Sequence, residues 1–172
     1  MGFFSKKITT DIIIASLVSL VNTHHSSFVN GFKDLLKKEQ GTISKEQDKE
    51  LLIIPMLAII RAVYALGDTP EIARIIGGFS YEIFNQYYPD AEERKKFEKL
   101  FNERLTEYYK IFDPEDKDLA IHLGQIFCTH FFGEEEDGSH LAMMMFVGTS
   151  FLTVTIETKK FLDKISSSYE IV

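Results

Sequence analysis

The chain has 172 residues, of which 45% are hydrophobic and 26% are charged, with 15 Phe, 7 Tyr and no Trp. A chain of this length is expected to form one domain around a single hydrophobic core, which needs neither a metal nor a disulfide. The formal net charge of −7 argues against a nucleic-acid partner, because a phosphate backbone attracts positive charge. The lone Cys128 cannot form an intramolecular disulfide, which is typical of a reducing compartment, and we expect a cytoplasmic protein.

Apolar residues recur at helical spacing from about Ile8 to Lys38, which predicts one long N-terminal helix. Lys6 and Lys7, followed by an apolar run, resemble the start of a signal peptide. Asp11 borders that run, however, no small-residue cleavage site follows it, and the helical pattern continues in phase. The segment is therefore interpreted as part of the folded domain.

The second predicted helix has the clearest start signal in the chain. Ser44 and Gln47, three residues apart, match a capping box, in which each residue bonds the backbone N–H of the other. The helix is expected to continue to Gly67, with a kink at Pro55 because proline lacks a backbone N–H donor.

Four more helices are predicted in the rest of the chain from capping residues, prolines and apolar periodicity. In chain order they are expected to run from Pro70 to Pro89, from Asp90 to Phe112, from Asp113 to the acidic run at 133–138, and from Ser139 towards the C-terminus. The predicted fold is an all-α, single-domain bundle of about six helices over residues 1–172.

Two of these helices carry more apolar residues than one solvent-facing side allows. The stretch Leu141–Ile156 contains no charged residue, and Leu51–Leu66 is interrupted only by Arg61. A helix that is apolar on all sides is enclosed by neighbours or shared with another subunit. One of the two is expected to be the central helix, and the surplus apolar surface predicts an interface with a protein partner, most simply a homodimer. Neither stretch reaches the roughly 20 apolar residues of a membrane span.

His130 is the first candidate site residue, because it falls within the apolar stripe of the fifth helix. A histidine in such a place is either a core residue bonded to a backbone carbonyl or a buried hydroxyl, or a ligand of haem or a metal. It cannot share an ion with His122, since eight residues of helix separate them by about 12 Å. Cys128 points to the opposite side of the helix.

Arg61 is the second candidate, since a guanidinium within an apolar helix needs a carboxylate or access to solvent. The sequence offers four acidic partners and does not choose among them: Asp11, Glu71, Glu82 and Glu157. The alternative is that Arg61 holds the acidic group of a bound apolar ligand.

Phe127 and Met145 complete the set of candidate ligand-binding residues. Phe127 neighbours His130 on the wheel, and Met145 belongs to the run Met143–Met145, whose flexible thioethers suit adaptable surfaces. Core packing is the simpler interpretation of this run, because its three side chains face three directions. Together the four residues would line an apolar cavity for haem, a lipid or another small molecule.

Familiar catalytic and metal-binding motifs are missing from the sequence. There is no HExxH, paired CxxC, Glu-x-x-His, P-loop, GxGxxG or GxSxG pattern. No catalytic residue, metal ligand or cofactor is therefore assigned. The favoured prediction is a non-enzymatic interaction or assembly module that self-associates, and the alternative is a bundle that binds or senses an apolar small molecule.

Overall fold

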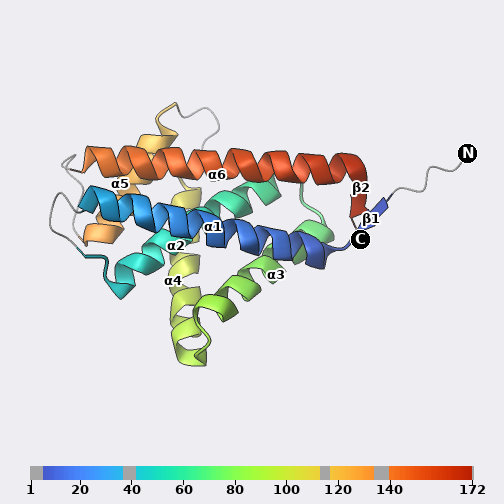
Figure 1. The fold of residues 1–172 in the computed structure, drawn as a ribbon, viewed down its shortest axis with the longest axis horizontal. Helices are drawn as coiled ribbons and strands as arrows, with labels where there is room; N and C mark the ends of the chain where they lie inside the picture. The colour runs from blue at the N-terminus through green and yellow to red at the C-terminus, as the bar shows by residue number, and fades with distance from the viewer. Residues whose placement is uncertain (1–5, 37–41, 113–116, 134–139, 172) are drawn as a thin grey trace, which may run out of the picture.

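Helices account for nearly all of the computed structural model, which describes residues 6–36, 42–112, 117–133 and 140–171 (Figure 1). The elements are β1 (Lys6–Ile8), α1 (Thr10–Leu36), α2 (Lys45–Tyr64), α3 (Pro70–Tyr87), α4 (Ala91–Tyr109), α5 (Leu119–Phe132), α6 (Leu141–Ser168) and β2 (Tyr169–Ile171). The predicted all-α bundle of six helices is confirmed, including the long first helix.

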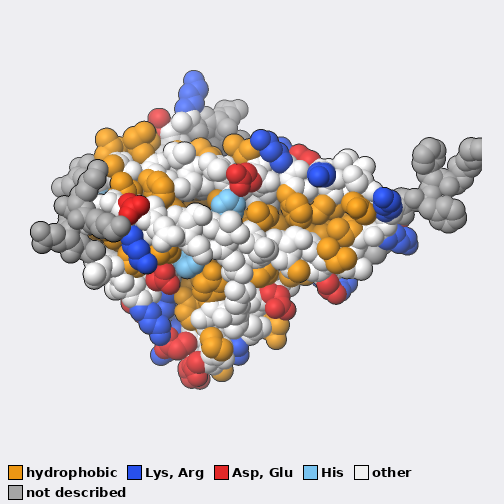
Figure 2. All heavy atoms as spheres, viewed as in Figure 1, with side chains coloured by type: hydrophobic (Ala, Val, Ile, Leu, Met, Phe, Trp, Pro, Cys, Tyr) orange, Lys and Arg blue, Asp and Glu red, His pale blue; other side chains and the backbone are white. Residues whose placement is uncertain are grey.

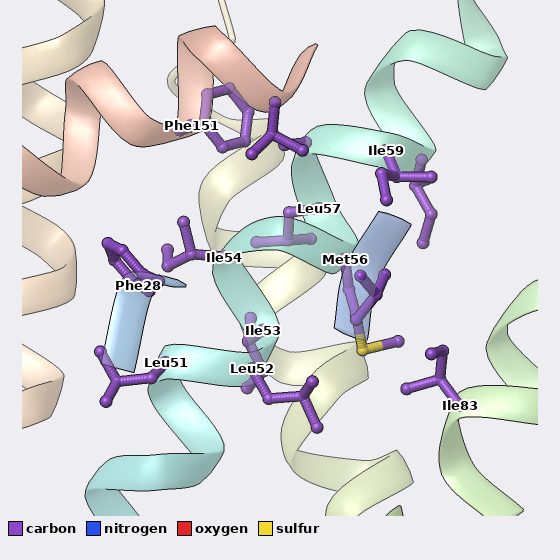
Figure 3. Packing of buried hydrophobic residues seen from close by; sticks show 14 of the residues in the cluster. Phe28, Leu51, Leu52, Ile53, Ile54, Met56, Leu57, Ile59, Ile83 and Phe151 are labelled. Carbon is purple, nitrogen blue, oxygen red and sulfur yellow. The ribbon is translucent and has the colours of Figure 1, made fainter. Parts of the chain in front are cut away.

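The centre of the bundle is α2, which contacts all five other helices. Every residue from Lys49 to Ile60 is buried. In Figure 3 the side chains of α2 extend to all sides, towards Phe28 on α1, Ile83 on α3 and Phe151 on α6. The helix apolar on all sides that the sequence predicts at the centre is therefore α2.

The capping box at the start of α2 is formed as predicted. The Gln47 N–H donates to Ser44 Oγ at 3.2 Å, and the Ser44 N–H donates to Gln47 Oε1 at 2.9 Å. Gln47 also donates through Nε2 to the carbonyl of Phe131, at 3.0 Å, which ties the first turn of α2 to the end of α5.

Caps of the predicted kind begin α3 and α4. Thr69 Oγ1 accepts from the Ile72 N–H at 3.3 Å, and Asp90 accepts from two N–H groups in the first turn of α4. Other predicted boundaries, at Gly41, at Asp113–Pro114, in the acidic run after Gly133 and at Ser139, lie outside the described residues. Gly133 itself ends α5 with φ +76°, a left-handed conformation that glycine adopts readily.

A close crossing joins α5 to α6, and two glycines make it possible. A Cβ at Gly124 would overlap the carbonyl of Met144, and a Cβ at Gly148 would overlap the carbonyl of Ala120. The backbones therefore meet without side chains between them. The sequence analysis did not predict this contact, because either glycine alone is an ordinary helix-weakening residue.

The expectation that Leu141–Ile156 needs full enclosure is wrong. Helix α6 packs against α5, α2 and α1, and Met143, Met144 and Val147 are buried. Its opposite side is open, and Leu141 and Met145 are 52% and 54% exposed. Neighbours cover α6 on one side only, whereas they surround α2.

The chain ends meet in a feature that the sequence analysis did not predict. Strand β1 pairs in parallel with β2, with Lys6 opposite Tyr169 and Ile8 opposite Ile171. This short ladder lies at the end of the molecule where α1 begins and α6 ends (Figure 1).

Candidate functional site

The outer side of α6 carries a row of exposed apolar side chains that we call the α6 stripe. Its members are Leu141, Met145, Leu152 and Ile156, which are 36 to 54% exposed. Spacings of four, seven and four residues place them on one side of the helix. Ile121, 40% exposed on the neighbouring α5, extends the apolar surface. Contiguous exposed apolar surface of this kind commonly marks an interaction site.

A second feature is a groove between α1 and α6, with α2 beneath it, which we call the α1–α6 groove. It has a volume of about 260 Å³, and its lining includes Ser27, Phe28, Pro55, Phe146, Ser150 and Val154. Figure 2 shows the face of the molecule formed by α1 and α6, where hydrophobic and neutral polar side chains predominate and histidine side chains lie near the middle.

His24 connects the two walls of this groove. It belongs to α1 and lines the groove, and its Nε2 lies 3.1 Å from Oε2 of Glu157 on α6. That distance is one of an ion pair, but Nε2 forms no hydrogen bond of acceptable geometry. The contact is therefore a charge contact with Glu157, which is 52% exposed, and not a fixed hydrogen-bonded pair.

His25, the next residue along α1, joins three helices on the other side of the groove. Its Nε2 lies 3.4 Å from Oδ1 of Asp48 on α2, and its Nδ1 lies 3.3 Å from the hydroxyl of Tyr87 on α3. Tyr87 in turn donates to Asn22 Oδ1 at 3.0 Å. The hydrogen bond from His25 lowers the pKa of Asp48, with further help from the positive charges of His25 and Lys33.

His130 lies in a polar network between α2, α4 and α5. Its Nε2 is 2.6 Å from Oε2 of Glu107, and Glu107 is 3.9 Å from the guanidinium of Arg104. Arg104 also donates three hydrogen bonds of 2.7 to 3.1 Å to the buried Glu50. The partner of His130 is therefore a carboxylate, rather than the carbonyl or hydroxyl expected of a core histidine.

Tyr108 adds a neutral phenol to this network. Its ring is fully buried, and burial raises the pKa of its hydroxyl well above the usual value. Glu50 burdens the phenolate further through charge repulsion. Tyr108 therefore stays protonated, and within the described part of the chain its hydroxyl forms no hydrogen bond.

Arg61 makes none of the four predicted ion pairs. Asp11 lies 3.6 Å from Arg74, Glu157 pairs with His24, and neither Glu71 nor Glu82 forms an ion pair with Arg61. The guanidinium instead lies over the ring of Phe112, 4.5 Å from its centre. Burial lowers the pKa of Arg61, and the aromatic face supplies part of the missing stabilisation.

The four predicted ligand-binding residues do not converge on one site. Phe127 is fully buried and packs against Phe32 and Phe131, away from any groove named above. Met145 lies on the outside of α6, whereas Met143 and Met144 are buried as core packing predicts. His130 and Arg61 contact different partners on different helices. Sequence periodicity placed each residue on its own helix but could not show that these helix faces lie apart.

Metal binding finds no preformed site in the described part of the chain, where no three His, Cys, Asp or Glu side chains are grouped to hold an ion. By length and composition, α1 and α6 are each apolar enough to cross a membrane. Core helices of soluble proteins and signal sequences meet the same criterion, and the prediction of no membrane span stays a prediction.

Comparison with protein-family models, with curated proteins and with solved structures finds no match. Function is therefore argued from geometry alone. The residues that matter most here, the α6 stripe and the groove around His24, share one signal in the sequence: an apolar helix whose residues are too numerous for one buried side.

Proposed function

We propose that the protein is an assembly module that forms a homodimer through the α6 stripe. The observation that carries this proposal is the row of four large apolar side chains left exposed on one side of α6. Removing such side chains from water contributes about 25 cal/mol per Å² of apolar surface. The described fold provides no cover for them.

The spacing of the stripe suits a second copy of the same chain. Leu141 and Ile156 lie equally far from the midpoint between Gly148 and Thr149, and so do Met145 and Leu152. A two-fold axis at that midpoint would pair two α6 helices antiparallel, with Leu141 of each copy opposite Ile156 of the other. Interfaces of two-fold dimers are self-complementary in this way.

The oligomeric state in solution tests the proposal. Sedimentation velocity over a wide range of concentration should show a reversible dimer, and Leu152→Glu should weaken dimerisation at least tenfold, because it places a charge in an apolar interface. Tyr81→Glu is the matched control, since Tyr81 is 64% exposed on α3, away from the stripe. A strict monomer, or equal loss of dimer in both variants, would contradict the proposal.

Cysteine cross-linking tests the orientation of the two helices. Met145→Cys and Leu152→Cys proteins, when mixed and oxidised, should form the mixed disulfide, because antiparallel pairing sets these positions opposite each other. Each variant alone should cross-link poorly. Efficient cross-linking of Met145→Cys to itself would instead indicate another arrangement. The native Cys128 is fully buried and interferes little.

A further inference from the structure

The α1–α6 groove lies on a different side of α6 from the α6 stripe. Phe146, Ser150 and Thr153 face the groove, whereas Leu152 and Ile156 face outwards. The proposed dimer would therefore leave the groove open. Its role can be argued independently of self-association.

Two kinds of surface line the groove. The rings of Phe28 and Phe146 stack at an interplanar angle of 12°, and Pro55 and Val154 add further apolar surface. Hydroxyl groups of Ser27 and other Ser and Thr residues stand between them. Such a lining, apolar with a few polar groups, is typical of small-molecule sites.

The size of the groove limits what fits. Its volume of about 260 Å³ lies just below the range of roughly 300 to 1,000 Å³ that holds drug-sized ligands. It equals the liquid volume of about nine water molecules. The ligand is therefore smaller than a nucleotide or a haem, of the size of one substituted aromatic ring.

Charge is present only at one end. None of the described residues lining the groove is Asp, Glu, Lys or Arg. Glu157 follows Thr153 by four residues on the same side of α6, and its carboxylate contacts His24. Because the carboxylate is half exposed and lacks a well-formed hydrogen bond from His24, it remains able to accept one from a ligand.

We propose that the α1–α6 groove binds a small primary amine with an apolar body. The body lies against Phe28, Pro55 and Phe146, and the ammonium group pairs with Glu157. An ammonium has three N–H donors, so it satisfies the carboxylate and the nearby Thr153 hydroxyl together. A carboxylate ligand would be repelled by Glu157, and an alcohol would lack the ion pair.

Three ligands with the same aromatic body test this assignment: phenethylamine, 2-phenylethanol and phenylacetate. In ¹H–¹⁵N correlation spectra of the full chain at pH 8, phenethylamine should give saturable shifts at Ser27, Ser150 and Thr153. It should bind about tenfold more tightly than 2-phenylethanol, the usual gain from a hydrogen bond to a charged group. Phenylacetate should not saturate. Absence of saturable shifts with phenethylamine, or equal binding of amine and alcohol, overturns the proposal.

Variants locate the bound amine. Glu157→Gln should weaken phenethylamine binding about tenfold, to the level of the alcohol, whereas Glu98→Gln, an equal charge change on the exposed side of α4, should leave it unchanged. Ser150→Leu should abolish binding by filling the groove, and its melting curve shows whether it folds. If it does not fold, Thr149→Phe at an exposed lining position replaces it. Binding that survives Glu157→Gln at full strength places the amine elsewhere.

Discussion

Helices α2 and α6 look alike in the sequence but occupy different environments. Each contains an apolar run of about four turns, yet Lys49–Ile60 of α2 is buried throughout whereas α6 exposes Leu141, Met145, Leu152 and Ile156. The cause is the number of covering helices, which surround α2 and cover α6 on one side. Apolar composition thus shows how much surface seeks cover, but not whether the same chain provides it.

The charged residues of the two helices differ in the same way. Glu50 on α2 has a side chain only 6% exposed, and Arg104 donates three hydrogen bonds to it. Burial opposes the charge of Arg104, but its bonds to Glu50 outweigh that effect and raise its pKa. Glu157 on α6 is 52% exposed and makes one charge contact, with His24.

The largest expected effect is at the buried pair. Arg104→Ala should lower the free energy of unfolding by about 3–5 kcal/mol, because it leaves the Glu50 carboxylate buried without a partner. Urea denaturation measures the change. Replacing both residues, in Glu50→Met with Arg104→Met, should restore most of the stability. His24→Ala, the equivalent change at Glu157, should cost about 1 kcal/mol or less. Equal costs for the two single variants would show that Glu50 is not enclosed.

The next effect compares matched apolar side chains. Ile53→Ala should cost about 2–5 kcal/mol, because Ile53 is fully buried in α2 and its loss leaves a cavity. Leu152→Ala should change monomer stability by about 0.5 kcal/mol or less, since Leu152 is 36% exposed. Denaturation at low protein concentration measures both without a contribution from self-association. A cost of several kcal/mol for Leu152→Ala would place α6 in the core.

The smallest effect concerns Asp48, at the start of α2, which is between these extremes at 46% exposure. Its pKa is below the usual 3.8 in the fold, so its stabilising contribution is complete above about pH 4 and is lost as the pH falls through the lower, folded value. Asp48→Asn should therefore flatten the loss of stability between about pH 5 and pH 2 by 1 kcal/mol or less. Asp163→Asn, an exposed change on α6, is the control. An identical pH profile for both variants would contradict the role of His25.

Local signals in the sequence predicted the fold well. The Ser44–Gln47 capping box, the Thr69–Pro70 start and the Asp90 cap depend on residues within one turn of each other, and all three are formed. Partners of charged side chains were not predictable in this way. His130 meets Glu107 and Arg61 meets Phe112 across helices, and such contacts depend on how the helices cross.

The sequence by itself determined the helices, because turns, caps and apolar periodicity act between residues close in the chain. It also determined that two helices carry surplus apolar surface. Only the tertiary structure decided that α2 is the enclosed one, since that depends on the approach of α5 to α6 at Gly124 and Gly148 and on all helices meeting around one axis. The same packing left the α6 stripe uncovered and formed the α1–α6 groove beside His24.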